Sequence, residues 1–443
     1  MPEGRDGAIA DLFGITARRQ RYLDVEAALA RAQGALGIIP ADAADRISAS
    51  AQLSLMDDER IDAGQARTGH TLVPLIEELD RVAGDPYGGY VHWGATTQNI
   101  QQTGDVLMLR DAHGMIVELL RQILLELSEL GERTAGLVMP ARTHWQHAVP
   151  MTFGLKVAAW SDVLIRHLER LGECRPRLLT CMVGGAAGTF GSLGAPGRQV
   201  QALVAADLGL TEMPVPARNI TDHFAELVSV LGMLAATCSG LADEVSRLMA
   251  EEFGEVSEGI PAGDVGSSTM PQKRNPKISQ GIVSDAAQVR ALVPLALDAM
   301  MQSHEVDGAR SAMMDRAVEG ACRLSYAMLT GVHDLLAGLE IFPDRMAHNL
   351  TLTNGLINAE NVMMHLAPRL GRQQAHGVVR DAAARAGSGE TTFLAALTAD
   401  PRVTEVCRPA EVAQLLDPST YVGLSEELAR ETSARARAAA TSH

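Results

Sequence analysis

The chain has 443 residues, of which 47% are hydrophobic and only 3% are aromatic. This length allows two or three domains with a large buried core. A core so poor in aromatic residues must be built from Ala, Leu, Val and Met, which favours helix-on-helix packing over a sheet sandwich. The formal net charge of −16 opposes nonspecific binding to nucleic acid or anionic membranes, so an anionic ligand needs a local basic site.

The cysteines and the N-terminal residues indicate the cellular compartment. The five cysteines are scattered, odd in number and without a Cys-x-x-Cys pair, which argues against a disulfide framework and favours a reducing cytoplasm. Residues 1–10 contain charges and no apolar centre, so they do not resemble a signal peptide. No apolar run approaches membrane-spanning length. We therefore expect a cytoplasmic protein that binds neither nucleic acid nor membrane.

Helical periodicity begins near the N-terminus. Apolar and alanine positions recur at helical spacing over residues 21–36, before a stop at Pro40, and a second helix is predicted from Ala41. The glycine-rich segment 84–90 is a strong break, and polar residues follow it before a long helical pattern. This break places the first domain boundary near residue 100.

Long apolar helical patterns dominate the middle of the chain. They are too apolar for isolated surface helices and predict one bundle of five helices. Their ranges are 103–130, 152–180, 223–257, 275–303 and 310–340. Shorter helical patterns after about residue 345 predict a small third domain. The expected fold is therefore all-α, with domains at 1–100, 101–345 and 346–443.

The segment Gly-Ser-Ser-Thr-Met-Pro-Gln-Lys-Arg-Asn-Pro at 266–276 combines hydroxyls and cations with flanking prolines, which core packing does not need. Turn-rich residues precede it, so it is predicted to be a mobile catalytic loop over a cleft. Its lysine and backbone N–H groups would attract a carboxylate. A serine here could act as a base if Lys273 and Arg274 stabilised its alkoxide. The alternative is an exposed basic turn.

A second group of chemically active residues spans 142–147, between Pro140 and Pro150. His144 and His147 could lie close together in a helical first turn, which would allow acid/base work or a metal site. No carboxylate or thiol completes a ligand set nearby, so no metal is predicted. One of the two histidines can also be purely structural.

Three further segments have both a functional and a structural interpretation. Thr96-Thr97-Gln98 precedes a long helix, where the hydroxyls either cap the helix or bind a ligand. His70, between glycine and threonine, is by itself more typical of a structural residue. The glycine-rich segment 184–194 lacks the G-x-G-x-x-G spacing and a preceding strand, so close backbone approach explains it better than nucleotide binding. No cofactor is predicted.

The eleven residues at 266–276 resemble the signature of the fumarase/aspartase superfamily. The resemblance implies a three-domain all-α fold whose five-helix bundles join in a homotetramer as a twenty-helix core, with active sites shared between subunits. It implies a small di- or tricarboxylate substrate and Ser267 as the base. Lys273 and Asn275 would hold a substrate carboxylate, and Thr96, Thr97 and Gln98 resemble the paired-hydroxyl loop that binds a carboxylate.

Two subfamilies share further segments with this chain. Arg-Thr-His at 142–144 is similar to the general-acid segment of adenylosuccinate lyases, which implies His144 as the proton donor and Thr143 beside the substrate. Gly-His-Thr at 69–71 is similar to their substrate-contacting histidine segment, which makes His70 a binding residue. The stretches at 23–33, 94–98 and 184–189 look most like 3-carboxy-cis,cis-muconate cycloisomerases.

The chain departs from both subfamilies at positions that bear on the substrate. Val306 stands where adenylosuccinate lyases have an arginine, and Arg310 is a displaced substitute. Ile220 and Thr221 stand where both subfamilies usually have glutamine and arginine, although Arg218 remains available to an anionic group. The tyrosine, serine and arginine that help adenylosuccinate lyases seat a phosphate are not visible. These departures argue against a nucleotide substrate.

The expected activity is β-elimination from a substituted succinate, with C–N cleavage and release of fumarate. Ser267 is the expected base and His144 the acid, and nitrite is a possible leaving group because nitrosuccinate lyases occur in this superfamily. The alternatives are a 3-carboxy-cis,cis-muconate cycloisomerase and an adenylosuccinate lyase. The non-enzyme alternative is an inactive structural bundle of the kind found among lens crystallins.

Overall fold

The computed structural model describes residues 7–259, 269–270 and 272–442. Its contacts divide the chain into two compact units. Unit 1 comprises residues 1–119, 167–239 and 281–330, and unit 2 comprises residues 120–166, 240–280 and 331–443. The three expected domains do not coincide with this division and remain a prediction.

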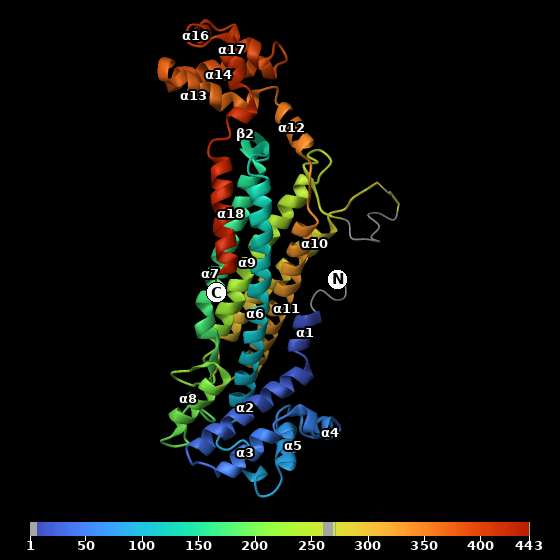
Figure 1. Cartoon of the computed structure of the whole chain (residues 1–443), viewed down its shortest axis with the longest axis vertical. Helices are drawn as coiled ribbons and strands as arrows, with labels where there is room; N and C mark the ends of the chain where they lie inside the picture. The colour runs from blue at the N-terminus through green and yellow to red at the C-terminus, as the bar shows by residue number, and fades with distance from the viewer. Residues whose placement is uncertain (1–6, 260–268, 271, 443) are drawn as a thin grey trace. The chain divides into compact units, whose positions relative to one another are not determined.

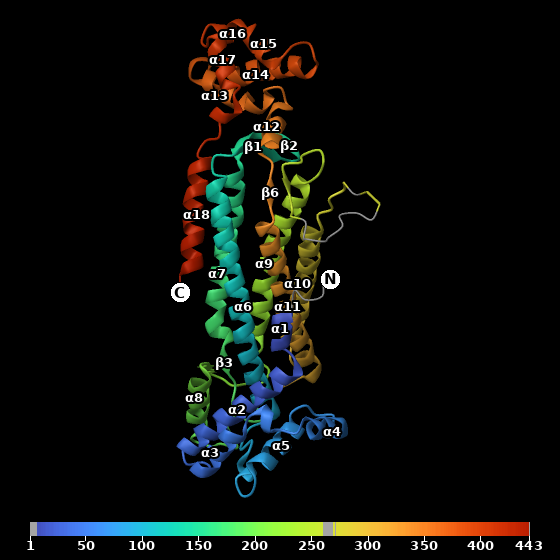
Figure 2. The ribbon, with the colours of Figure 1, turned by 45° about the vertical axis from the view of Figure 1, so that its right-hand side comes forward.

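Five long helices form the bundle predicted from the apolar periodicity, and the all-α fold is confirmed. They are α6 (Thr97–Arg133), α7 (Phe153–Leu178), α9 (Asp222–Leu248), α10 (Lys277–Ala299) and α11 (Gly308–Ala337). Each helix contributes residues to both units. Within each unit, segments of the long helices run side by side (Figures 1 and 2).

The buried faces of the long helices follow the helical repeat. In unit 2, Leu120, Ile123, Leu124 and Leu127 of α6 are fully buried at spacings of three and four residues. In unit 1, the fully buried residues of α9 repeat in the same way from 228 to 235. This pattern explains why the bundle could be predicted from apolar spacing.

Unit 1 adds short helices to its part of the bundle. They are α1 (Gly7–Leu12), α2 (Ile15–Ala35), α3 (Ala41–Ser50), η1 (Leu53–Leu55), α4 (Asp58–Thr68), α5 (Val73–Ala83), η2 (Gly88–Tyr90) and α8 (Gly197–Leu208). The two-residue strands β3 (Thr180–Cys181) and β4 (Thr211–Glu212) pair in parallel beside α8. The predicted helices at 21–36 and from Ala41 are therefore α2 and α3.

Unit 2 contains two antiparallel strand pairs and the C-terminal helices. The strands are β1 (Val138–Thr143), which pairs with β2 (Gln146–Thr152), and β5 (Val256–Ser257), which pairs with β6 (Glu340–Ile341). The helices are α12 (Pro343–Thr351), η3 (Leu356–Asn358), α13 (Ala359–Leu370), α14 (Arg372–Gly387), α15 (Phe393–Thr398), α16 (Pro401–Thr404), α17 (Pro409–Leu415), η4 (Pro418–Thr420) and α18 (Ser425–Thr441). Helices α13 to α17 enclose a small core that includes the fully buried Phe393 (Figure 1).

One helix qualifies the expectation that no apolar run approaches membrane-spanning length. Helix α9 is long and apolar enough to cross a membrane by length and composition, and 67% of its apolar window is buried in the protein. A buried core helix passes the same test, so this one helix is weak support for a membrane span. All five cysteines are buried and free.

Candidate functional site

The start of α6 holds the predicted paired hydroxyls in a fixed turn of unit 1. The Asn99 side chain is fully buried, and its Oδ1 accepts hydrogen bonds from the backbone N–H groups of Thr96 (3.1 Å) and Gly185 (3.0 Å). Among the described residues, neither Thr96 nor Thr97 uses its hydroxyl to accept a backbone N–H of α6. The capping interpretation is therefore not what the structure shows, and Asn99 stabilises this turn.

The glycine-rich segment 184–194 packs closely against neighbouring backbone and side chains. A Cβ atom on Gly184 would lie 2.5 Å from Cγ of Pro216, and one on Gly188 would lie 2.7 Å from the Pro216 carbonyl oxygen. Gly188 also has a φ of +74°, which side chains rarely adopt. Close backbone approach therefore accounts for these glycines. The segment leads to the short helix α8 before the chain returns to the bundle.

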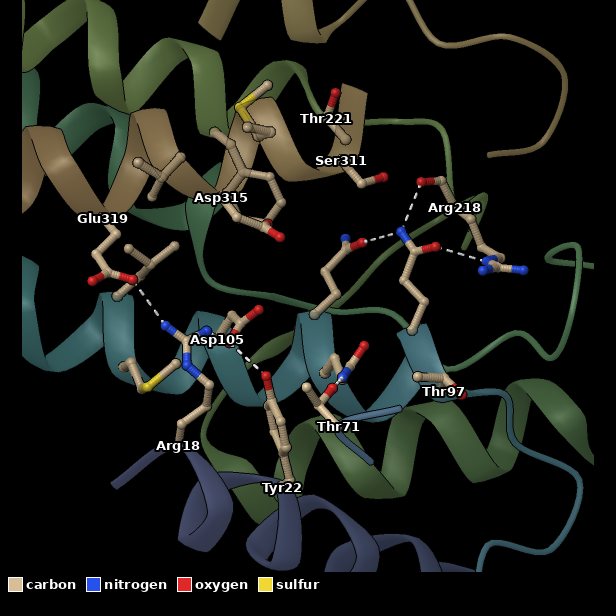
Figure 3. Close-up of a pocket in the computed structure, with 18 of the residues that line it drawn as sticks. Arg18, Tyr22, Thr71, Thr97, Asp105, Arg218, Thr221, Ser311, Asp315 and Glu319 are labelled. Carbon is tan, nitrogen blue, oxygen red and sulfur yellow. Dashed lines mark hydrogen bonds and ion pairs between the residues drawn. The ribbon is translucent and has the colours of Figure 1, made fainter. Parts of the chain in front are cut away.

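A cavity of about 600 Å³ lies in unit 1. Five of the predicted binding residues line it, namely His70, Thr96, Thr97, Gln98 and Arg218. Figure 3 shows Thr97 and Arg218 at one side of this cavity. The tertiary structure thus brings together residues that are as far apart as 70 and 218 in the sequence.

Gln98 and Arg218 hold each other in place. The Arg218 Nε donates to Gln98 Oε1 at 2.7 Å, and the Gln98 Nε2 donates to the Arg218 carbonyl at 3.0 Å. A further guanidinium nitrogen of Arg218 donates to the carbonyl of Ala186 at 3.0 Å. Burial lowers the pKa of Arg218 from its ordinary value. Gln98 therefore positions a partly buried cation on the cavity wall.

His70 is oriented by backbone hydrogen bonds. Its Nδ1 accepts from the backbone N–H groups of Leu72 (3.3 Å) and Val73 (3.2 Å), so the ring proton is on Nε2. That Nε2 lies 3.5 Å from Thr97 Oγ1, at the limit of a hydrogen bond. This geometry leaves an N–H donor beside the paired hydroxyls.

His144 and His147 lie on a β-hairpin of unit 2, so the prediction of a helical first turn was wrong. Thr143 pairs with Gln146, and the two residues between them, His144 and Trp145, have φ values of 49° and 66°. Positive φ at both central positions is the geometry of a tight hairpin turn and is incompatible with a right-handed helix. His144 is exposed at the tip, whereas His147 follows on β2 opposite Arg142.

A buried ion pair anchors this hairpin within unit 2. Both terminal nitrogens of Arg142 donate to Glu255, at 2.7 and 2.9 Å, and Glu255 is fully buried. The Arg142 guanidinium also lies 4.6 Å from the centre of the Phe253 ring. Burial, with a smaller contribution from Arg142, lowers the pKa of His147. His147 is thus favoured as a neutral, structural imidazole, while His144 stays accessible.

Glu258 joins the two ends of the segment that carries the predicted loop. Its carboxylate accepts from the backbone N–H groups of Ile278 (2.8 Å) and Ser279 (3.1 Å), at the start of α10. Lys273 is exposed and Asn275 is half-buried. Ser267, the predicted base, lies outside the described residues.

The predicted site residues therefore fall into two groups. His70, Thr96, Thr97, Gln98 and Arg218 line the unit 1 cavity, whereas Thr143, His144, Lys273 and Asn275 belong to unit 2. Arg310 is not among the described residues that line the cavity, and its guanidinium donates to the Asp298 carbonyl at 3.0 Å. Its substrate contact, like the other residue roles, remains a prediction.

Sequence reasoning missed several residues that organise these groups. Asn99 and Glu258 act through backbone contacts; helix-start preferences could have revealed Asn99, whereas Glu258 is about twenty residues from the N–H groups that it binds and leaves no local signal. Arg18 and Asp105 form a hydrogen-bonded ion pair in the cavity at 2.8 Å. Asp105 interrupts an otherwise apolar helical pattern, and that interruption was visible in the sequence.

No group of three or more His, Cys, Asp or Glu side chains able to hold a metal ion occurs in the described part of the chain. The cavity presents instead hydroxyl, amide, imidazole and guanidinium groups beside the N-terminus of α6. Such groups suit a carboxylate, because helix N-termini and charged donors both stabilise an anion.

Comparison with known proteins identifies the relatives of this chain. A family model described as Lyase matches residues 6–291, and one described as Adenylosuccinate lyase C-terminus matches residues 355–432. The 3-carboxy-cis,cis-muconate cycloisomerase of Pseudomonas aeruginosa is 39% identical, over 93% of this chain and 90% of that protein. The N-acetyl-S-(2-succino)cysteine lyase of Enterococcus italicus is 36% identical, over 92% of this chain and 90% of that protein.

A solved structure agrees with these sequence relationships. The crystal structure of a fumarate lyase from Mesorhizobium sp. BNC1 superimposes with a TM-score of 0.91 at 34% identity. The match covers 98% of this chain and 99% of that one. The likeness therefore extends over the long helices and both ends of the chain.

Proposed function

This chain belongs to the fumarase/aspartase superfamily of lyases, and on that premise we propose that it catalyses β-elimination from a substituted succinate, with C–N cleavage and release of fumarate. The observation that carries the proposal is the cavity at the start of α6, where Thr96, Thr97 and Arg218 surround a space suited to a carboxylate. Ser267, Lys273, Asn275 and His144 are all present in the sequence, which argues against the alternative of an inactive structural bundle.

In the proposed mechanism, Ser267 removes the proton from the carbon next to one carboxylate. The electron pair moves into that carboxylate and forms a dianion, which Lys273 and Asn275 stabilise. The bond to the leaving group then breaks as the carbon–carbon double bond of fumarate forms. His144 donates a proton to the departing atom, a step that typically contributes about 10²–10⁴-fold to the rate.

The second carboxylate of the substrate occupies the unit 1 cavity in this proposal. The hydroxyls of Thr96 and Thr97 and the Nε2 proton of His70 donate to it. Gln98 acts through Arg218, since the two side chains are joined at 2.7 Å. Thr143 is proposed to contact the substrate beside His144.

We further propose that the active site is completed in a homotetramer, as the family resemblance implies, with His144, Lys273 and Asn275 of unit 2 and the carboxylate-binding residues of unit 1 supplied by different subunits. Light scattering should give a tetrameric mass. Mixed tetramers should regain part of the activity if one site uses both subunits, when His144→Asn subunits, inactive in unit 2, are combined with subunits inactivated in unit 1 by Thr96→Val and Thr97→Val. A monomeric mass, or mixtures as inactive as their parents, would contradict shared sites.

A substrate panel tests the reaction itself. Aspartate, nitrosuccinate, argininosuccinate, adenylosuccinate and an S-linked succinyl cysteine should each be assayed for fumarate by its ultraviolet absorption. Release of fumarate from a nitrogen-substituted succinate, at a rate above that from the S-linked compound, would support C–N cleavage. Preference for adenylosuccinate would identify the alternative nucleotide lyase, and preference for the S-linked compound would identify C–S cleavage.

The runner-up function is a 3-carboxy-cis,cis-muconate cycloisomerase, and the 39% identity to the Pseudomonas aeruginosa enzyme favours it. Related proton chemistry would then close a lactone ring on a tricarboxylate. Loss of the conjugated ultraviolet band of carboxymuconate, without formation of fumarate, would replace the elimination proposal with this one.

A further inference from the structure

The unit 1 cavity has a second, acidic side away from the paired threonines. Arg18 of α2 donates to Asp105 Oδ1 at 2.8 Å and to Glu319 Oε2 at 3.0 Å, so one guanidinium is shared by two carboxylates. A third carboxylate, Asp315, also lines the cavity and has no hydrogen bond or ion pair within the described part of the chain. Figure 3 shows these four side chains together, on the opposite side of the view from Arg218.

The charge on this acidic side is only partly balanced. Burial raises the pKa of Asp105 to about 7 despite its contact with Arg18. Burial, with Glu319 as a like charge, also raises the pKa of Asp315, although its side chain is open to the cavity. For both groups desolvation is the largest cause and neighbouring carboxylates add to it, while the positive charge of Arg18 opposes the shift. A cation placed there would be stabilised, whereas an anion would be repelled.

The other arginines that line the cavity are engaged elsewhere. Arg19 pairs with Asp58 at 3.0 Å and with Asp62 at 2.5 Å, and neither aspartate lines the cavity. Arg218 is held by Gln98 on the side of the paired hydroxyls. Outside the cavity lining, Arg323 pairs with Glu319 at 3.6 Å, so two guanidinium groups, those of Arg18 and Arg323, face three carboxylates and the acidic side keeps more carboxylates than cations.

Thr221 provides an independent sign that this cavity takes a polar ligand. Its side chain lines the cavity, is 7% exposed and has an Oγ1 atom without a hydrogen-bond partner in the described structure (Figure 3). Buried hydroxyls nearly always have a partner, so an unpaired one beside a cavity marks a place for a ligand atom or water. Val306, which lines the same cavity, adds no charge.

We propose that Asp315, Glu319 and Thr221 form a second subsite. This subsite binds an ammonium group at the end of a substituent on the leaving-group nitrogen of the substrate. The inference rests on the proposed elimination and specifies its substrate class. It also gives a meaning to the two departures from related enzymes. Neutral residues stand at 221 and 306, where an arginine would place a cation against the acidic side and remove its preference for a positively charged ligand.

Equilibrium binding can test this subsite without requiring turnover. The probes are three aspartates whose nitrogen carries a 3-aminopropyl, butyl or 2-carboxyethyl group, so that the tails have similar length but are cationic, neutral or anionic. Calorimetry on the full-length protein should give at least tenfold tighter binding of the aminopropyl compound than of the carboxyethyl compound. The preference should shrink as salt is added, because ions screen the interaction.

Variants locate the preference at the named residues. Asp315→Asn should weaken binding of the aminopropyl compound several-fold while the affinity for the butyl compound stays the same, which also shows that the variant is folded. Thr221→Arg should reverse the preference in favour of the carboxyethyl tail. Asp45→Asn changes an exposed carboxylate of α3 outside the cavity and should leave all three affinities as they are.

The outcomes separate this inference from the proposed reaction. Equal affinity for the three tails, or a preference that Asp315→Asn leaves intact, would overturn the subsite even if fumarate is released. A preference for the cationic tail that depends on Asp315, without fumarate from any of the three probes, would support the subsite and contradict the elimination of amines.

Discussion

The proposed site residues of the two units differ in how they are held. In unit 1, Thr96, Gln98 and Arg218 are fixed by side-chain and backbone hydrogen bonds of 2.7–3.1 Å around a cavity. In unit 2, His144 and Lys273 are exposed, although the segments that carry them are anchored by the buried Glu255 and Glu258. The proposed carboxylate-binding residues are thus preorganised by hydrogen bonds, whereas His144 and Lys273 are open to solvent.

The largest expected effect tests the proposed base, Ser267. Ser267→Ala should lower kcat by about 10²–10⁴-fold, because the proton on carbon then has no positioned base. Binding of the substrate should change little, since the carboxylate contacts remain. The neighbouring Ser268→Ala is the matched control and should stay active. Full turnover by Ser267→Ala, measured as fumarate release, would remove both the elimination and the cycloisomerase proposals.

The next effect concerns the anchor of the hairpin. Glu255→Gln removes the fully buried carboxylate that pairs with the partly buried Arg142 and should lower the free energy of unfolding by about 3–5 kcal/mol. Urea unfolding at fixed protein concentration measures this loss. The control is Glu390→Gln, which breaks the exposed pair with Arg385 and should cost at most about 1 kcal/mol. Similar losses in the two variants would mean that the hairpin is not anchored by its buried ion pair.

The acidic side of the cavity should make stability depend on pH. The pKa of Asp105 is raised from 3.8 to about 7, so the folded protein keeps a proton that the unfolded chain loses as the pH rises above about 4. This contribution to stability is therefore present at low pH and is lost as the pH rises through about 7. The free energy of unfolding should therefore fall by on the order of 2 kcal/mol between about pH 5 and 8.

Asp105→Asn removes this titration. The variant should gain stability relative to the parent protein as the pH is raised from about 5 to 8, as measured by urea unfolding at the two values. A stability difference between the two proteins that does not change with pH would show that Asp105 titrates as an ordinary carboxyl group.

The smallest expected effect tests the proposed carboxylate-binding residues of unit 1. Thr97→Val removes one hydroxyl donor from the proposed carboxylate site and should raise KM about tenfold with little change in kcat, as expected for one hydrogen bond to a charged group. Thr97→Ser keeps the hydroxyl and should restore KM. A loss confined to kcat, with KM unchanged, would instead place Thr97 among the groups that act only in the transition state.

Much of the fold and part of the site could be predicted from the sequence. Apolar spacing predicted the five long helices, because burial of one helix face leaves a periodic signal in the residues themselves. The clustering of Thr97, His70 and Arg218 was expected only through the family resemblance. The hairpin at His144 was mistaken for a helical turn, since a two-residue turn with positive φ has no strong signal when neither residue is glycine or asparagine.

The sequence by itself determined the helical architecture, the family and hence the class of chemistry, because periodicity and a long local motif are written in consecutive residues. Only the tertiary structure decided which charges meet. Arg18 lies 87 residues from Asp105 and 301 from Glu319, and no local pattern joins them. It also decided that Thr221 is buried with a hydroxyl that has no hydrogen-bond partner among the described residues. Burial and pairing depend on packing between distant helices, and they set the charge of the cavity from which we infer the substrate.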